Sequence, residues 1–203
     1  MKLKLQQFLM RFLLPNAYLL KKEVPMIAAI IAAAGSGERF GSTIPKVLIS
    51  LGDRTLIEHA LASLSAVVDE VVITAPAGHE DAIRAIAADR ATVVTGGSTR
   101  SESVRIGLAV ISPTAEYVLV HDAARALASS DLVRRVIAAL RAGEVAVIPG
   151  LPQVDTVKVV DGDGYVTSTP DRAPLRRVQT PQGFSYELLQ KAHAGTADAT
   201  DDA

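Results

Sequence analysis

The chain has 203 residues, of which 49% are hydrophobic and 21% are charged, and its formal net charge is −1. A chain of this length and composition can bury the core of one sizeable α/β domain, and its balanced charge gives no reason to expect a nucleic acid as partner. It contains no cysteine, which excludes a disulfide framework and a thiolate metal site. This is compatible with a reducing compartment, and we expect a cytoplasmic protein.

Residues 1–25 are basic and apolar and contain no glycine. Arg11 and Pro15 interrupt the apolar run and no A-x-A cleavage site follows, so a signal peptide is not indicated, and the run is too short to span a membrane. A basic amphipathic surface helix is an alternative. We favour a dispensable extension, with Met26 as an alternative start, followed by a single domain over residues 26–203 that does not associate with membranes.

From Met26 onward, short apolar runs typical of buried strands alternate with segments of helical period. Capping boxes at residues 55–58 and 99–102 predict the first turns of two helices. Strands are expected at residues 27–33, 71–75, 91–95, 117–121 and 145–148, and further helices at 79–89, 130–142 and 185–194. This alternation predicts a mostly parallel twisted sheet with helices on both faces, and a ligand site beyond the carboxyl ends of the strands.

A different pattern follows residue 148. Runs rich in β-branched residues at 154–160 and 165–169 flank Asp161-Gly-Asp-Gly164, which is a strong hairpin signal. A two-stranded hairpin is marginal in water, so the protruding arm over about residues 151–172 needs another surface to pack on. The simplest such surface is a second copy of the chain, which predicts a homodimer formed through the hairpin arm.

The first apolar run ends in a loop of small residues that contains Gly35 and Gly37 and is followed by Arg39 and Lys46. Glycine lets backbone N–H groups approach a ligand closely, and the two cations add positive charge, so the stretch suits a phosphate chain. It is not a Walker A loop, since no Gly-Lys pair follows, and it is not a dinucleotide fingerprint, since the third glycine comes one residue late. An ordinary strand-to-loop turn is the alternative.

Asp122 directly follows the strand expected at residues 117–121, so we expect it at the same sheet edge as the glycine loop. A carboxylate there can hold Mg²⁺ together with substrate phosphates. A capping or salt-bridged aspartate, paired with Arg125, is the alternative. Residues 96–98, Gly-Gly-Ser, form the third loop at this edge, where glycines let backbone groups read the edge of a base; a plain turn is the alternative.

Short motifs occur in order from about Met26 to the end of the chain. They are Ala32-Ala-Ala-Gly-Ser-Gly-Glu-Arg39, Pro45-Lys46, Gly96-Gly-Ser-x-Arg100-x-x-Ser103, Val120-His-Asp-Ala-Ala-Arg125, Asp155-Thr156-x-Lys158, Thr180-Pro-Gln182 and Thr200-Asp-Asp-Ala203. Each motif is weak alone, whereas the ordered set is specific. With this set the sequence resembles the 2-C-methyl-D-erythritol 4-phosphate cytidylyltransferase family of the non-mevalonate isoprenoid pathway.

The resemblance implies a Rossmann-like nucleotidyltransferase fold. It implies transfer of a cytidylyl group from CTP to 2-C-methyl-D-erythritol 4-phosphate, giving 4-diphosphocytidyl-2-C-methyl-D-erythritol and pyrophosphate, with Mg²⁺ as cofactor. Arg39 and Lys46 match transition-state stabilisers and Asp122 a metal-binding position. The positions that match the nucleotide site are Ala33, Ala34, Gly35, Gly37, Gly97, Ser98, Ser103, Asp122 and Ala123. Thr156 and Arg172, on the arm, match residues that reach into the partner's site and hold the substrate phosphate.

The sequence departs from the family pattern at both ends and at Ala126, where many members have proline. Members continue past the T-D-D-A motif through a strand that carries a lysine, so the chain resembles a truncated member, in which we expect nucleotide binding to survive better than turnover. The closest rival function is that of a ribitol 5-phosphate cytidylyltransferase, against which residues 121–125 favour the methylerythritol enzyme. The other rival is a nucleotide-binding but catalytically impaired fragment.

Overall fold

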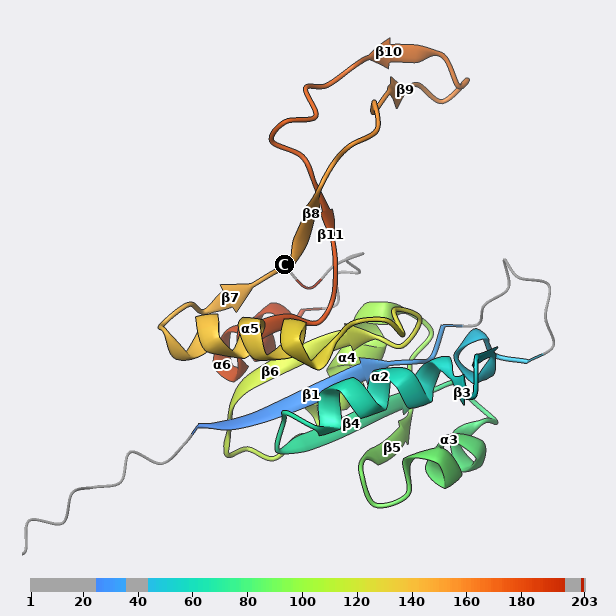
Figure 1. The fold of residues 1–203 in the computed structure, drawn as a ribbon, viewed down its shortest axis with the longest axis vertical. Coiled ribbons are helices and arrows are strands. Elements are labelled where there is room, and N and C mark those ends of the chain that lie inside the picture. Colours follow the sequence, from blue (N-terminus) through green and yellow to red (C-terminus); the bar gives the residue numbers. More distant parts are fainter. Residues whose placement is uncertain (1–24, 36–43, 196–201, 203) are drawn as a thin grey trace, which may run out of the picture.

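A six-stranded sheet forms the centre of the structure, a computed structural model that describes residues 25–35, 44–195 and 202 (Figure 1). From one edge to the other its strands are β5 (Thr92–Thr95), β4 (Glu70–Ala75), β1 (Met26–Ala32), β6 (Ala115–Asp122), β12 (Gln182–Ser185) and β7 (Ala146–Val147). Strand β1 pairs in parallel with β4 and β6, and β4 pairs in parallel with β5. The predicted mostly parallel α/β sheet is therefore confirmed.

Helices cover both faces of this sheet, as predicted. They are α2 (Leu56–Ser65), α3 (Glu80–Ala87), α4 (Arg100–Leu108), α5 (Ser130–Arg141) and α6 (Tyr186–Ala192). The side chains of β1 alternate between two cores: Ala29 and Ile31 pack with α2, α3 and α5, whereas Ala28 and Ile30 pack with α4 and α6. Burial on both faces explains why β1 is continuously apolar. Along the stretches that the structure describes, no helix combines the length and the apolar character needed to cross a membrane.

Strand β12 is absent from the sequence-based prediction, and it runs antiparallel to both of its neighbours, β6 and β7. A Cβ atom on Gly183 would lie 2.6 Å from Cγ1 of Val136, so α5 packs directly against the backbone of this strand. Glycine permits that close approach. It also leaves a four-residue segment with no apolar alternation, which is why the pattern does not reveal a strand here.

Capping fixes where two helices begin. After the 3-10 turn η2 (Lys46–Leu48) and the short hairpin of β2 (Ser50–Leu51) and β3 (Arg54–Thr55), Thr55 and Glu58 form the predicted capping box of α2. Thr99 caps α4 by accepting the N–H of Glu102 at 3.1 Å. The Glu102 carboxylate, however, accepts the N–H of Ser98 at 2.6 Å, so the second predicted box is only half right. This bond ties α4 to the loop before it.

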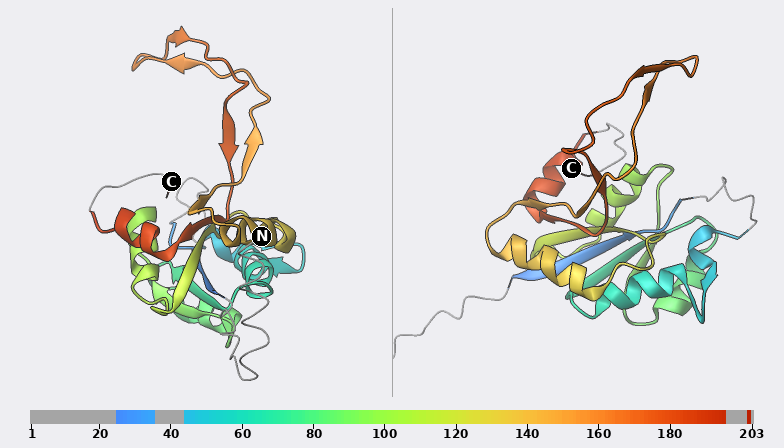
Figure 2. Two further views of the ribbon diagram at one scale, coloured as in Figure 1. Left: turned by 90° about the vertical axis from the view of Figure 1, so that its left-hand side faces the viewer. Right: turned by 45° about the horizontal axis from the view of Figure 1, so that its top comes forward.

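The arm leaves the body of the molecule between β7 and β12 (Figures 1 and 2). Its tip is the predicted antiparallel pair, β9 (Val159–Val160) and β10 (Val166–Ser168), joined by a turn in which Gly164 has a φ of +86°. Its base is a second antiparallel pair, β8 (Gly150–Pro152) and β11 (Arg176–Val178), so the arm extends beyond the predicted residues 151–172. Every residue of these four strands is exposed.

Candidate nucleotide site

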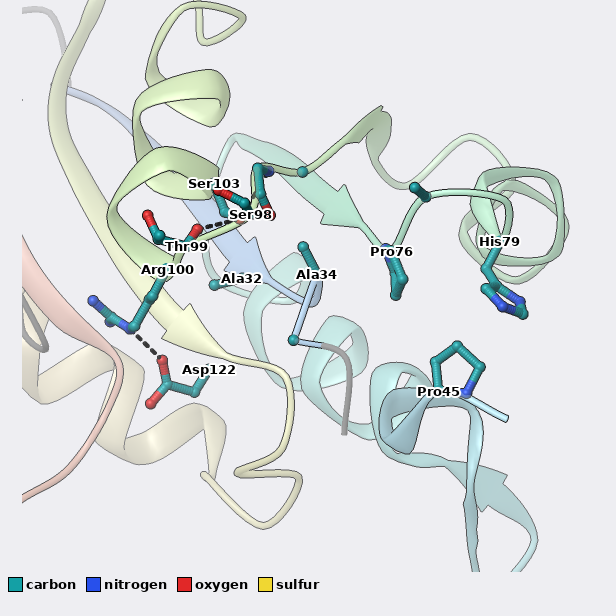
Figure 3. Close-up of a pocket in the computed structure, with 14 residues that line it drawn as sticks. Ala32, Ala34, Pro45, Pro76, His79, Ser98, Thr99, Arg100, Ser103 and Asp122 are labelled. Atoms are coloured by element: carbon teal, nitrogen blue, oxygen red, sulfur yellow. Dashed lines mark hydrogen bonds and ion pairs between the residues drawn. The ribbon is translucent and has the colours of Figure 1, made fainter. Parts of the chain in front are cut away.

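A cleft of about 760 Å³ opens at the carboxyl ends of β1, β4, β5 and β6 (Figure 3). The strand register explains why loops distant in sequence meet here: Ala32 of β1 pairs with Thr74 of β4 and with Asp122 of β6, so the three strands end at one level. The cleft is lined by Ala32, Ala34, Gly35, Pro45, Pro76, Ala77, His79, Gly96, Gly97, Ser98, Thr99, Arg100, Ser103 and Asp122. The three loops expected at this edge therefore share one cavity.

The glycine pair after β5 sits where no side chain fits. A Cβ atom on Gly96 would lie 2.3 Å from Cβ of Ala34, because the loop after β5 touches the loop after β1. A Cβ atom on Gly97 would lie 2.2 Å from Cγ of Glu102. The Gly96 N–H donates to the carbonyl of Ala75 at 2.8 Å, which continues the β4–β5 ladder into the cleft. Backbone atoms thus form this wall of the cleft, where they are close enough to contact the edge of a nucleotide base.

Side chains of α4 hold this loop in shape. Ser103 Oγ accepts the N–H of Gly97 at 3.1 Å and donates to the carbonyl of Thr99 at 2.9 Å. Glu102 Oε2 accepts from both the backbone N–H and the hydroxyl of Ser98, at 2.6 and 2.7 Å, and the Ser98 hydroxyl is the largest cause of the lowered pKa of Glu102. Three residues that the sequence assigned to the nucleotide site, Gly97, Ser98 and Ser103, therefore form one bonded unit on the cleft wall.

Asp122, the last residue of β6, presents its carboxylate to the cleft between two arginines. Its Oδ1 lies 3.0 Å from Nε of Arg100, and its Oδ2 lies 3.2 Å from Nε of Arg125. The salt bridge to Arg125 that the sequence left open as an alternative is thus present. Among the described residues, no group of three or more His, Asp or Glu side chains could hold a metal ion. A metal bound here would have one protein carboxylate and would take its other ligands from a substrate or water.

Arg100 links Asp122 to a second, fully buried carboxylate. Its Nη1 lies 2.6 Å from Oδ2 of Asp202, whose side chain is 0% exposed, and Oδ1 of Asp202 lies 3.2 Å from Nε2 of His193. Burial alone would lower the pKa of the Arg100 guanidinium, but the negative charges of Asp202 and Asp122 outweigh burial and raise it. In the sequence, Arg100 is marked only as one member of the motif at residues 96–103 and has no predicted role. Its partner Asp202 lies 102 residues away, a pairing that no local pattern signals.

His121 lies beneath the site in the core and is held by Thr180. Thr180 Oγ1 accepts the N–H of Asp122 at 3.1 Å and lies 2.9 Å from Nδ1 of His121, at hydrogen-bond distance. Burial lowers the pKa of His121 to about 4. The ring is therefore neutral near pH 7, and no partner within the described part of the chain lies at hydrogen-bond distance from Nε2. Its place is structural, joining β6 to the segment before β12.

A family model described as IspD: 2-C-methyl-D-erythritol 4-phosphate cytidylyltransferase matches residues 27–203. The chain belongs to this family. A 2-C-methyl-D-erythritol 4-phosphate cytidylyltransferase of Rhodococcus opacus (strain B4) is 51% identical over 180 residues, which cover 87% of this chain and 79% of the relative. The fold and the order of the motifs thus agree with the resemblance seen in the sequence.

Solved structures of the same family share the fold. A 4-diphosphocytidyl-2C-methyl-D-erythritol synthase from Anaerococcus prevotii DSM 20548 superposes with a TM-score of 0.76 at 36% identity, over 88% of this chain and 81% of that one. A 2-C-methyl-D-erythritol 4-phosphate cytidylyltransferase from Thermus thermophilus superposes with a TM-score of 0.70 at 36% identity, over 88% and 81% of the two chains. The predicted Rossmann-like nucleotidyltransferase architecture is therefore confirmed.

The residues that the cytidylyltransferase resemblance assigned to the phosphates are only partly described. Gly37 and Arg39 lie outside the described residues. Lys46 is half-buried at the start of η2, directly after Pro45, which lines the cleft. Ala34 and Gly35 line the cleft as well. The structure thus places one of the two predicted cations next to the cleft wall.

Two alanines that the resemblance placed in the nucleotide site form backbone hydrogen bonds between strands of the sheet. Ala33 is 1% exposed, and its N–H donates to the carbonyl of Thr74 at 3.0 Å. Ala123 is 0% exposed, and its N–H donates to the carbonyl of Ala32 at 3.1 Å. Neither lines the cleft. They hold the ends of β1 and β6 together beneath the site.

Thr156 and Arg172 lie on the arm and do not line the cleft of their own chain. Both are exposed, and Arg172 Nη1 donates to the carbonyl of Val154. Figure 2 shows the arm pointing away from the sheet. The structure therefore does not bring these two predicted residues together with Asp122 within one chain.

Proposed function

We propose that this protein transfers the cytidylyl group of CTP to the phosphate of 2-C-methyl-D-erythritol 4-phosphate. Family membership supports the reaction, and one observation supports the site: the loops after β1 and β5 and the carboxylate of Asp122 line a single cleft at one sheet edge. Open α/β sheets bind their ligands at this edge. The active unit is a single domain over residues 26–203, and it works in the cytoplasm.

A phosphate oxygen of the acceptor attacks the α-phosphorus of CTP in line. The new P–O bond forms as the bond from the α-phosphorus to the bridging oxygen breaks, and pyrophosphate leaves with that oxygen. Because the nucleophile is already an anion, the reaction needs positioning and charge neutralisation more than a base. Arg39 and Lys46 supply this positive charge and stabilise the transition state.

The cytosine is bound at the wall formed by Gly97, Ser98 and Ser103. Gly96 and Gly97 bring backbone atoms to the surface of the cleft, since a Cβ atom at either position would collide with Ala34 or Glu102. Hydrogen bonds from α4 keep this wall rigid before a ligand arrives. A wall that is rigid before binding lowers the entropy that binding costs.

Asp122 holds Mg²⁺ at the carboxyl end of β6. Mg²⁺ in nucleotide sites is bound by one or two carboxylates together with phosphate oxygens, and Asp122, which is the one acidic side chain among the described residues that line the cleft, fits that ligand set. When bound, the metal neutralises charge on the triphosphate. Each oxygen of Asp122 also lies beside one guanidinium, Oδ1 beside Arg100 and Oδ2 beside Arg125.

The arm completes the site of a second subunit. It exposes apolar side chains at Leu151, Val159, Val160, Tyr165 and Val166, which is costly for a segment surrounded by water. Packing against a second chain covers them and carries Thr156 and Arg172 toward the partner's cleft. There Arg172 binds the acceptor phosphate through its planar fork.

The test is pyrophosphate release from CTP and Mg²⁺ with 2-C-methyl-D-erythritol 4-phosphate or ribitol 5-phosphate as acceptor. We expect release with the methylerythritol phosphate at least tenfold faster, since a misfitted acceptor forfeits about 1.4 kcal/mol or more of transition-state binding. Faster release with ribitol 5-phosphate assigns the rival activity. Calorimetric binding of CTP without release from either acceptor identifies an impaired nucleotide-binding fragment.

A further inference from the structure

One guanidinium joins the cleft carboxylate to a carboxylate that is fully buried. Arg100 Nε lies 3.0 Å from Asp122 Oδ1, and Arg100 Nη1 lies 2.6 Å from Asp202 Oδ2. Figure 3 shows the Arg100 side chain turned toward Asp122 on the wall of the cleft. The proposed chemistry assigns no role to Arg100 or Asp202.

The far end of Arg100 is anchored. The Asp202 side chain is 0% exposed, and its second oxygen lies 3.2 Å from His193 Nε2 after α6. A carboxylate buried in this way cannot turn without losing both partners, which costs more than breaking a pair on the surface. Arg100 itself begins α4 and is only 24% exposed. Its guanidinium is thus fixed at both the backbone and the Nη1 end.

A fixed planar guanidinium sets the direction of the group that it binds. A guanidinium carries its donors in one rigid plane, so Arg100 holds Asp122 through Nε and Asp202 through Nη1 at a fixed relative direction, whereas an ammonium acts as a point charge. Arg125 holds the other oxygen of Asp122, but its side chain is 40% exposed, against 24% for Arg100. Arg100 is therefore the more rigid of the two supports.

We propose that Arg100 is a positioning residue for the transfer reaction: anchored by Asp202, it holds the Asp122 carboxylate in the orientation that the reaction uses. This inference rests on the proposed function. A purely structural role, in which Arg100 only neutralises the buried charge of Asp202, makes a different prediction. The two roles separate when the buried charge is removed together with the arginine.

The decisive comparison is between Arg100→Gln and the double variant Arg100→Gln/Asp202→Asn. The single change leaves Asp202 buried without its guanidinium, so both the unfolding midpoint and kcat should fall. The double change removes both charges and should restore the midpoint in urea. If Arg100 positions Asp122, kcat stays about ten- to a hundredfold low, as expected for a misplaced group. Recovery of kcat together with the midpoint overturns the proposal.

Arg100→Lys keeps the charge beside Asp202 and loses the fork, so it remains informative if the Gln variants fold poorly. We expect a nearly unchanged midpoint, calorimetric CTP affinity in Mg²⁺ within about threefold of the parent, and a lower kcat. In an Asp122→Asn background the same change should lower kcat no further, because Arg100 then has nothing left to position. Additive losses in that background contradict the proposal.

Arg105→Gln is the matched control. Arg105 lies on the same helix and donates to the carbonyl of Gly195 at 3.3 Å, so its loss also removes a contact between α4 and the segment after α6, without touching Asp122. We expect its kcat to match the parent; an equal loss of kcat in this variant contradicts a specific role for Arg100. If the parent chain itself releases no pyrophosphate, the proposed function fails, and that result is distinct from a failure of the Arg100 variants.

Discussion

The hydroxyl oxygen of Thr180 lies 3.1 Å from the backbone nitrogen of Asp122 and so joins the end of β6 to the segment that enters β12. The same oxygen lies 2.9 Å from Nδ1 of His121. Thr180 is 3% exposed, so one buried hydroxyl lies at hydrogen-bond distance from both the Asp122 nitrogen and the His121 ring beneath the cleft.

Replacing Thr180 with Val, which has nearly the same shape, removes both bonds and leaves two buried polar groups of β6 without this partner. We expect the free energy of unfolding in urea to fall by about 1–3 kcal/mol. Thr180→Ser keeps the hydroxyl and is the control; it should lose much less. Equal stability of the parent and the Val variant would show that the bonds add nothing to folding.

The pH dependence of stability should carry a contribution from His121. Burial lowers its pKa from 6.5 to about 4, so between these values the unfolded chain binds more protons than the folded chain. Stability must then rise with pH across this window, by at most about 1.4 kcal/mol per unit, and be lost as the pH falls through it. We expect the dependence to be shallower in His121→Gln, measured by urea unfolding in steps of pH. Parallel profiles of the two proteins contradict the neutral, buried histidine.

Removing the cleft carboxylate should raise the requirement for metal. In Asp122→Asn we expect the Mg²⁺ concentration for half-maximal pyrophosphate release to increase several-fold, because a neutral amide is a weaker ligand for a hard cation. Asp131→Asn is the control, since Asp131 is 75% exposed and pairs with Arg135 on α5. An unaltered Mg²⁺ titration in Asp122→Asn would mean that Asp122 serves only the two arginines.

The loop after β5 should not tolerate a methyl group. In Gly96→Ala the new Cβ would lie 2.3 Å from Cβ of Ala34 and 3.1 Å from Oγ of Ser103, so the two loops that form the cleft must separate. We expect calorimetric CTP affinity to fall at least tenfold, or about 1.4 kcal/mol. Gly162→Ala, where no atom lies within 4 Å of the added methyl, should bind CTP like the parent. Unchanged affinity in Gly96→Ala places the nucleotide elsewhere.

A shared site predicts complementation between two inactive variants. Arg39→Ala removes a cation proposed to stabilise the transition state and Arg172→Ala removes one on the arm, so a mixed dimer keeps one site with both residues. After subunit exchange, verified by mass spectrometry of labelled chains, about a quarter of the parent activity should return if exchange is random. No recovery in an exchanged mixture means that the arm serves its own chain.

The sequence best predicts the parts of the fold whose structure depends on residues close together in the chain. Residues 27–31 are continuously apolar because β1 is buried on both faces, and Thr55 with Glu58 marks the start of α2 by a bond three residues long. Strand β12 was not predicted, because Gly183 has no side chain and α5 packs directly against its backbone, so the strand lacks an apolar pattern. The base of the arm was not predicted either, because β8 and β11 pair across more than twenty residues and are joined by the whole tip of the arm instead of a short turn.

In the candidate site, too, the residues that depend on local sequence were predicted and those that depend on distant contacts were not. Asp122 is predictable because a strand delivers it to the sheet edge, and the glycine pair is predictable because only glycine permits the contact of two loops. The anchoring of Arg100 by Asp202 depends on Asp202 lying beside the start of α4, which is a property of the whole fold. Two charged residues that are 102 positions apart show no characteristic spacing from which their pairing could be predicted.

The guanidinium of Arg125 is divided between the cleft and the arm. It donates from Nε to Asp122 and from Nη1 to Oε1 of Gln179, 2.9 Å away, and Gln179 directly follows β11 and bonds through its N–H to Pro149 before β8. A ligand that draws Arg125 from the carboxylate thereby also loosens the root of the arm. By thermodynamic reciprocity, any partner that fixes the direction of the arm changes how firmly the cleft retains its ligand. In a dimer in which each arm reaches the partner's cleft, Arg125 would therefore couple occupancy of one cleft to the arm that serves the other.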